Sequence, residues 1–259
     1  MKKALSLLVL SICLTSTIAV AQTSNLLASY ESHLSRLNKW EQEYANDFRY
    51  DSLEAINKSL IRLLIQNPGL LNADFSKLNG KGSVVSTSED KRVRIYSWDD
   101  GTGGTMRSAN SVIHYKVGSQ IKSEELLKDE DTMEYRMVPF YRDLHSVATP
   151  TDSFYVVVTH LIGSSGVGSY EIQAFKIVSD TLDWNVKAFE TKSKILSSIS
   201  YEYDVTWGGP NRTADPPVIK IDWPKKTFRI PLIDEKNRIT GRHLVYAFNG
   251  QRFKYQRVE

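Results

Sequence analysis

The amino-acid sequence predicts an α+β protein, in which a mainly antiparallel β-domain follows an N-terminal helical hairpin. Between residues 24 and 66, apolar side chains recur every three or four positions, which is the period of one helix face. Beyond about residue 80 they recur every second position, which is the period of one strand face. Most of the later runs are not separated by a helical pattern of 10–15 residues, and this favours antiparallel pairing over a βαβ fold.

The hairpin is predicted from an apolar stripe and two boundary signals. Seven large side chains form the first part of the stripe: Leu27, Tyr30, Leu34, Leu37, Trp40, Tyr44 and Phe48. Asp51 and Glu54 have the spacing of a capping box, which predicts the start of a second helix, and the Asn-Pro-Gly run at 67–69 predicts its end. We expect the stripe to pack on the chain's own β-domain, with Trp40 as a buried anchor. The alternative is a docking face for another protein.

The β-domain is predicted from runs rich in Val, Ile, Tyr, Phe and Trp that are bounded by turn residues. These runs cover residues 92–97, 112–117, 154–162, 170–178, 200–207, 218–223, 227–233, 243–248 and 252–256. Residues 224–226 join two runs tightly, and Asn249-Gly250 predicts a hairpin with a type I′ turn. Two longer stretches, 122–131 and 208–217, are expected to be loops that either connect strands or form the rim of a site.

The expected architecture is a β-sandwich or an open barrel, in preference to a partial β-propeller. A weak repetition of strand groups suggests propeller blades, but its spacing is irregular. About 180 residues also fall short of six blades of 40 or more residues each. We divide the chain into a signal peptide (1–21), an N-terminal helical segment (22–79) and an antiparallel β-domain (80–259).

The first 21 residues predict export. Lys2 and Lys3 precede an apolar run over residues 5–14, and Ala19-Val20-Ala21 is a small-x-small cleavage site, so we expect Gln22 to begin the mature chain. A membrane anchor is disfavoured, because a span needs about 20 apolar residues and a Thr-Ser-Thr run interrupts this one. The expected location is periplasmic, outer-membrane-associated or secreted.

The composition excludes several classes of chemistry. The only cysteine, Cys13, lies in the expected signal peptide, and Ile12 before it disfavours acylation. The mature chain therefore lacks the thiols needed for disulfides, cysteine-ligated zinc or thiol catalysis. Removing the two N-terminal lysines leaves 31 basic against 30 acidic residues, a net charge of +1. This balance gives no reason to expect a nucleic-acid partner, and no membrane span is expected after cleavage.

The stretch from Ser97 to Thr105 is the most distinctive motif. Asp99 and Asp100 precede a glycine-rich loop, and two carboxylates there could ligate calcium. The spacing does not match an EF-hand, and aspartates before glycines also bond the backbone of a tight turn. We favour the turn and expect neither a metal nor a cofactor; Asp99 and Asp100 remain the only candidate ligands.

The sequence singles out no catalytic residue. The loop at 163–169 lacks both the P-loop lysine and the G-x-S-x-G spacing. The five histidines lack the zincin spacing, and His145 with Asp143 has no marked serine to complete a triad. Glycoside hydrolysis needs two suitably spaced carboxylates, which a sequence cannot place. Trp98, Trp184, Trp207 and Trp223 could stack on sugars if exposed, but strand tryptophans more often fill a core.

Two stretches of the sequence resemble a known group of bacterial proteins. The run from Ser88 to Arg107 resembles a signature of uncharacterised exported β-rich proteins of Bacteroidetes-type bacteria, and residues 246–253 resemble their closing hairpin. Gln22 after the cleavage site also suits that group. The resemblance implies a periplasmic or surface location. It implies no activity, so no residue's role is carried over.

Three functional hypotheses follow. The first is a non-enzymatic binding protein of the periplasm or cell surface, because strand aromatics and loops are abundant and no catalytic signature accompanies them. The second is a glycan-directed hydrolase that uses loop carboxylates as acid and base. The third is a structural subunit of a cell-envelope complex that docks through the helical hairpin. The expected partner is accordingly a glycan or an envelope protein.

Overall fold

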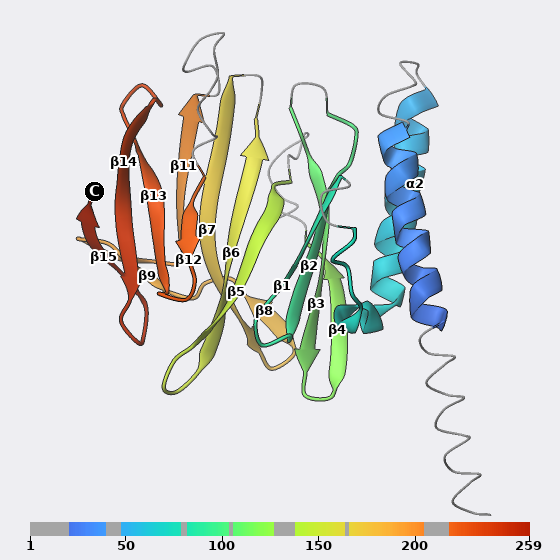
Figure 1. The fold of residues 1–259 in the computed structure, drawn as a ribbon, viewed down its shortest axis with the longest axis horizontal. Helices are drawn as coiled ribbons and strands as arrows, with labels where there is room; N and C mark the ends of the chain where they lie inside the picture. Colours follow the sequence, from blue (N-terminus) through green and yellow to red (C-terminus); the bar gives the residue numbers. More distant parts are fainter. Residues whose placement is uncertain are drawn as a thin grey trace, which may run out of the picture.

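The computed structural model describes residues 21–39, 48–78, 82–103, 106–126, 138–163, 166–204 and 218–259. A layer of two helices and three β-sheets follow one another along the longest axis (Figure 1). The predicted fold class is confirmed: a helical hairpin precedes antiparallel sheets, which do not close into a barrel. Several predictions concern residues outside the described ranges: the signal peptide apart from Ala21, Trp40, Tyr44, Trp207 and the loop over 208–217.

The helical hairpin consists of α1 (residues 21–39) and α2 (Phe48–Gln66), and a short 3₁₀ helix, η1 (Pro68–Asn72), follows. α2 begins three residues before Asp51, so the capping-box prediction placed its start too late. It ends directly before Asn67, as predicted. None of the described helices is long and apolar enough to cross a bilayer.

The N-terminal sheet has the order β1-β2-β3-β4 and lies against the helices. Its strands are β1 (Ser83–Thr87), β2 (Val93–Asp99), β3 (Ala109–Val117) and β4 (Gln120–Glu125). β4 corrects the expected loop over 122–131, because residues 122–125 pair with β3. The charge of this edge strand concealed it, since edge strands often carry charged side chains.

The middle sheet has the order β11-β7-β6-β5, and β8 pairs with the far end of β7. Its strands are β5 (Phe140–Ala148), β6 (Ser153–Ile162), β7 (Val167–Val178), β8 (Thr181–Asp183) and β11 (Ser198–Asp204). β6 is buried along most of its length, because other layers cover both faces of this sheet.

The C-terminal sheet has the order β10-β9-β15-β14-β13-β12. Its strands are β9 (Phe189–Glu190), β10 (Ile195–Leu196), β12 (Lys220–Asp222), β13 (Thr227–Ile233), β14 (Ile239–Phe248) and β15 (Phe253–Val258). Only the short contact between β9 and β15 is parallel among its pairings. The hairpin predicted at Asn249-Gly250 is present, but Gly250 alone has positive φ (97°), so the turn is not type I′.

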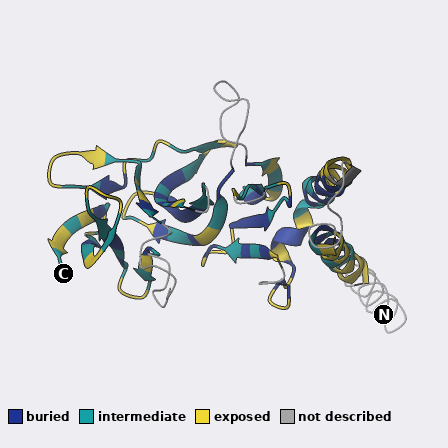
Figure 2. Ribbon diagram, turned by 90° about the horizontal axis from the view of Figure 1, so that it is seen from above, coloured by how far each residue is buried: buried dark blue, intermediate teal, exposed yellow. Residues whose placement is uncertain are grey.

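Three apolar cores separate the layers. Figure 2 colours the ribbon by burial, with the buried residues in dark blue. In the first core, Tyr30, Leu34 and Leu37 of the predicted stripe pack with Trp98 of β2. The described part of the stripe is therefore covered by the chain's own β-domain. The second core joins the N-terminal and middle sheets, and the third joins the middle and C-terminal sheets.

Candidate functional site

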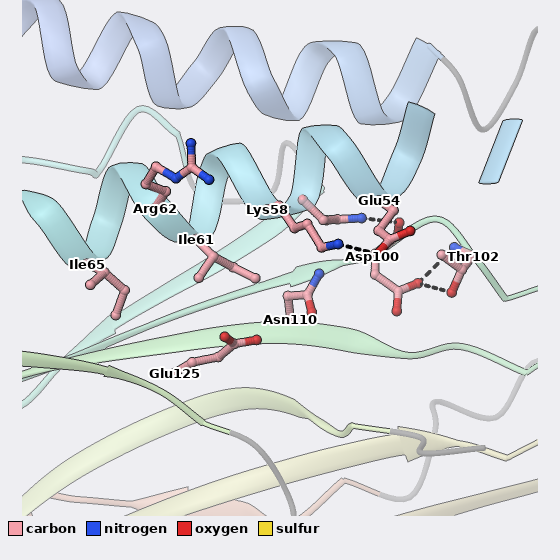
Figure 3. A pocket seen from close by; sticks show the side chains of 10 residues that line it. Glu54, Lys58, Ile61, Arg62, Ile65, Asp100, Thr102, Asn110 and Glu125 are labelled. Carbon is pink, nitrogen blue, oxygen red and sulfur yellow. Dashed lines mark hydrogen bonds and ion pairs between the residues drawn. The ribbon is translucent and has the colours of Figure 1, made fainter. Parts of the chain in front are cut away.

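A groove of about 550 Å³ lies between α2 and the N-terminal sheet (Figure 3). Its size is that of a small-molecule site. One wall is a face of α2, and the other is formed by the turn after β2 and by β3 and β4. The groove is lined by Glu54, Asn57, Lys58, Ile61, Arg62, Ile65, Asp100, Thr102, Asn110 and Glu125.

The helix wall follows from the helical period. Leu53, Ile56, Leu60 and Leu64 form the stripe of α2 that packs into the first core. Glu54, Asn57, Ile61 and Ile65 each come one position after a residue of this stripe, and so they border the groove beside it.

The sheet wall follows from strand register. Asn110 pairs with Trp98, and Glu125 pairs with Val112. Trp98 and Val112 pack against the helices, so Asn110 and Glu125 also face the helices. Glu124 pairs with Ile113 of the second core and thus lies on the opposite face.

Buried polar contacts hold the two walls in place. The Asn57 side-chain amide donates to the backbone carbonyl of Asp100 (2.8 Å), and its carbonyl accepts from the Trp98 indole (2.9 Å). Further along α2, the Ser123 hydroxyl donates to the carbonyl of Ile65 (2.8 Å). Each contact satisfies a polar group at the helix–sheet boundary, and together they fix the groove's shape.

His114 and Arg94 tie the end of the helical segment to the same sheet. His114 Nε2 donates to the carbonyl of Leu64 (3.0 Å), so its Nδ1 accepts from the Tyr96 hydroxyl (3.1 Å). Arg94 donates to the carbonyls of Leu70 and Ala73, both at 2.7 Å. Burial, reinforced by the Arg94 charge, lowers the pKa of His114 to about 4, although the bond to the Leu64 carbonyl opposes the shift. The ring is therefore neutral at physiological pH.

Two polar side chains of the groove have no partner among the described residues. The Glu125 carboxylate is half-buried and forms no hydrogen bond or ion pair with any described residue, and neither does the Asn110 amide. Burial raises the pKa of the Glu125 carboxyl. Lys58 instead pairs with Glu54 (2.5 Å), and Figure 3 shows Arg62 pointing away from Glu125. A ligand that paired with this carboxylate would offset part of the cost of desolvating an unpaired charge.

Asp99 and Asp100, the sequence candidates for calcium, take part in the turn after β2. Asp99 accepts from the backbone amide of Gly101 (2.9 Å) and pairs with Arg107 (3.0 Å). Asp100 accepts from the amide and hydroxyl of Thr102 at 2.8 and 2.7 Å. In the described part of the chain, no three acidic or histidine side chains are grouped to hold a metal ion.

His145 lies at a junction of the three sheets, but its partner is Glu89 rather than Asp143. Its Nδ1 is 2.7 Å from Glu89 Oε1, and its ring stacks on Trp223 at 4.2 Å. The Ser146 hydroxyl donates to Glu89 rather than to His145, so the three do not form a nucleophilic triad. Burial opposes ionisation of Glu89, but the bonds from His145 and Ser146 outweigh it and lower the pKa of this carboxyl.

A second histidine cluster lies on the middle sheet. His160 Nε2 is 3.0 Å from the Tyr203 hydroxyl, and its Nδ1 is 3.5 Å from an Arg142 guanidinium nitrogen. Its ring stacks on Tyr170 at 4.3 Å. Burial and the Arg142 charge lower the pKa of His160 to about 4. These contacts are those of a histidine packed within a sheet.

The described tryptophans mostly fill cores. Trp98 is fully buried, so it cannot stack on a sugar, and Trp184 packs on Phe175 at 4.4 Å. Sequence reasoning missed Asn110 and Glu125. Only the pairing of β3 with β2 and with β4 reveals that these two residues face α2.

A second groove, of about 630 Å³, lies on the middle sheet. Glu171 of β7 and Glu202 of β11 both line it, together with Thr159 and Ser200.

Comparisons of the sequence and the structure with protein families, with curated proteins and with solved structures gave no match.

Proposed function

We propose that the protein is a non-enzymatic binding protein of the periplasm or cell surface, and that the groove under α2 holds its ligand. The main support for this proposal is that the half-buried carboxylate of Glu125 has no partner among the described residues. A bound ligand would supply the missing interaction. Asn110 offers a donor and an acceptor beside it, and Ile61 and Ile65 offer apolar contact.

The binding interpretation is preferred to docking through the hairpin for a physical reason. The third hypothesis required an uncovered apolar stripe, and Tyr30, Leu34 and Leu37 are buried within the molecule. The groove, by contrast, is open to solvent and bordered by helix and strands that are held by direct hydrogen bonds.

The test is a thermal-shift screen of the mature protein against small polar metabolites. Ligands that bind the folded state raise its melting temperature by mass action. Asn110→Trp fills the groove and should remove the shift, whereas Gln120→Trp, at the exposed far end of β4, should keep it. Circular dichroism establishes that both variants fold. The proposal fails if no compound shifts the wild type, or if both variants respond as the wild type does.

One observation favours the hydrolase as a second candidate. Glu171 pairs with Ser200, and Glu202 pairs with Ser169, so the two glutamates are diagonal neighbours on one face. The backbones of such neighbours lie about 7–8 Å apart, so their flexible side chains can reach the separation of about 6.5–9.5 Å between the carboxyl groups of inverting glycosidases. One carboxyl group would protonate the leaving oxygen while the other removes a proton from the attacking water.

The hydrolase candidate has its own assay, which measures the release of reducing sugar from bacterial and host polysaccharides. Glu171→Gln and Glu202→Gln should each abolish the release, because each removes one half of the acid–base pair. Glu190→Gln, in the C-terminal sheet, should leave it intact. Activity that survives both substitutions would exclude this pair as the catalytic groups.

A further inference from the structure

The chemistry inside the groove selects among ligand classes. Its polar groups are unevenly used: Lys58 is turned toward Glu54, and Arg62 points away (Figure 3). Neither cation therefore neutralises Glu125, on the opposite wall. The interior that a ligand meets is anionic at this point, although the whole lining carries both signs of charge.

An apolar surface faces this carboxylate. Ile61 and Ile65 project from α2 toward the side of the groove that holds Glu125 and Asn110 (Figure 3). A fully hydrated inorganic cation gains nothing from this surface. A cationic group carried on a hydrocarbon chain gains contact with both walls, because the chain leaves water when it packs on the isoleucines.

We propose that the groove binds a primary alkylammonium, the ammonium group contacting Glu125 and Asn110 and the hydrocarbon part packing under Ile61 and Ile65. This inference rests on the proposed binding function and names its ligand class. An ammonium has three N–H donors and no acceptor, which suits the carboxylate of Glu125 and the amide oxygen of Asn110. A carboxylate or phosphate ligand would be repelled by Glu125.

The test uses 1,5-diaminopentane as the probe, with isothermal titration calorimetry on the folded mature protein. Pentane-1,5-diol has the same chain without charge, and glutarate reverses the sign of the charge. We expect the diamine to bind at least tenfold more tightly than the diol, and glutarate to show no binding.

The residue-level test compares two adjacent glutamates. Glu125→Gln removes the proposed counter-charge and should weaken diamine binding at least tenfold. Glu124→Gln removes the same charge from the same strand but from the opposite face, and should change the affinity by less than twofold. Equal effects of the two substitutions would show that diffuse negative charge, rather than this groove, attracts the diamine.

The outcomes separate this inference from the proposed function. If the diol or glutarate binds better than the diamine and Asn110→Trp removes that binding, the groove is a binding site and the ammonium inference is wrong. If the diamine does not bind and no compound in the screen binds in a groove-dependent way, both proposals fail.

Discussion

Two buried histidines should make the protein sensitive to mild acid. His114 lies between the helices and the N-terminal sheet, and His160 lies between the middle and C-terminal sheets. Burial lowers the pKa of each to about 4 in the folded protein, from a value of 6.5 in an unperturbed histidine. Both rings use Nδ1 as an acceptor, so protonation would break that bond and place a charge near an arginine.

The sign of the effect follows from the lowered pKa. Below pH 6.5 the two histidines bind protons in the unfolded chain but remain neutral in the folded protein, so acid favours unfolding. The loss begins as the pH falls through 6.5 and is complete near pH 4, where the folded histidines also become protonated. For a pKa of 4 folded and 6.5 unfolded, each histidine removes about 2 kcal/mol of unfolding free energy between pH 7 and pH 5.

The assay is urea unfolding at pH 7 and pH 5, with His114→Gln and His160→Gln. Glutamine can keep a side-chain hydrogen bond but does not titrate, so contributions from the carboxylates cancel in the comparison. Each variant should reduce the difference between the two pH values by about 2 kcal/mol, and the double variant by about 4 kcal/mol, because the sites lie in separate layers. A variant with the same pH dependence as the wild type would refute the reasoning for that histidine.

Three further predictions concern a turn, a wall contact and export. Gly103→Ala should lower the unfolding free energy by about 1–3 kcal/mol, since its Cβ would lie 1.8 Å from the carbonyl oxygen of Met106. Gly69→Ala, where a Cβ meets nothing within 4 Å, is the matched control in the same urea experiment. Asn57→Ala should lower the unfolding free energy by about 2–3 kcal/mol, because it leaves the Trp98 indole and the Asp100 carbonyl without their hydrogen-bond partner. A loss below about 0.5 kcal/mol would contradict this. Mass spectrometry of the exported protein should find Gln22 at its N-terminus, and an N-terminus at Met1 would contradict cleavage.

The turn at Asn249 shows that the local sequence predicts the position of a hairpin but not its turn type. The Asn-Gly pair correctly predicted a hairpin, because turn residues between two apolar runs constrain the chain locally. The turn type was wrong, since Asn249 uses its side chain to accept from the amides of Gln251 and Arg252, both at 3.0 Å. A side-chain bond to the backbone offers an alternative to the positive φ that type I′ requires.

The strand β2 shows that an alternating sequence pattern does not reveal which faces of a strand are buried. In its sequence, Val93, Ile95 and Ser97 on one face alternate with Arg94 and Tyr96 on the other. The structure buries both faces, because the helices cover the side that carries Arg94 and Tyr96. A period of two identifies the two faces of a strand but not what covers each of them.

The sequence by itself determined the helical hairpin, most of the strands and their antiparallel character. These features depend on periodicity, turn residues and connection length, which act over a few neighbouring residues. Only the tertiary structure decided that three sheets stack, that Glu89 rather than Asp143 meets His145, and that Glu125 and Asn110 face Ile61 and Ile65 across a groove. Such contacts join residues about 50 or more positions apart. They depend on strand register and on how layers pack, and no local pattern encodes these directly.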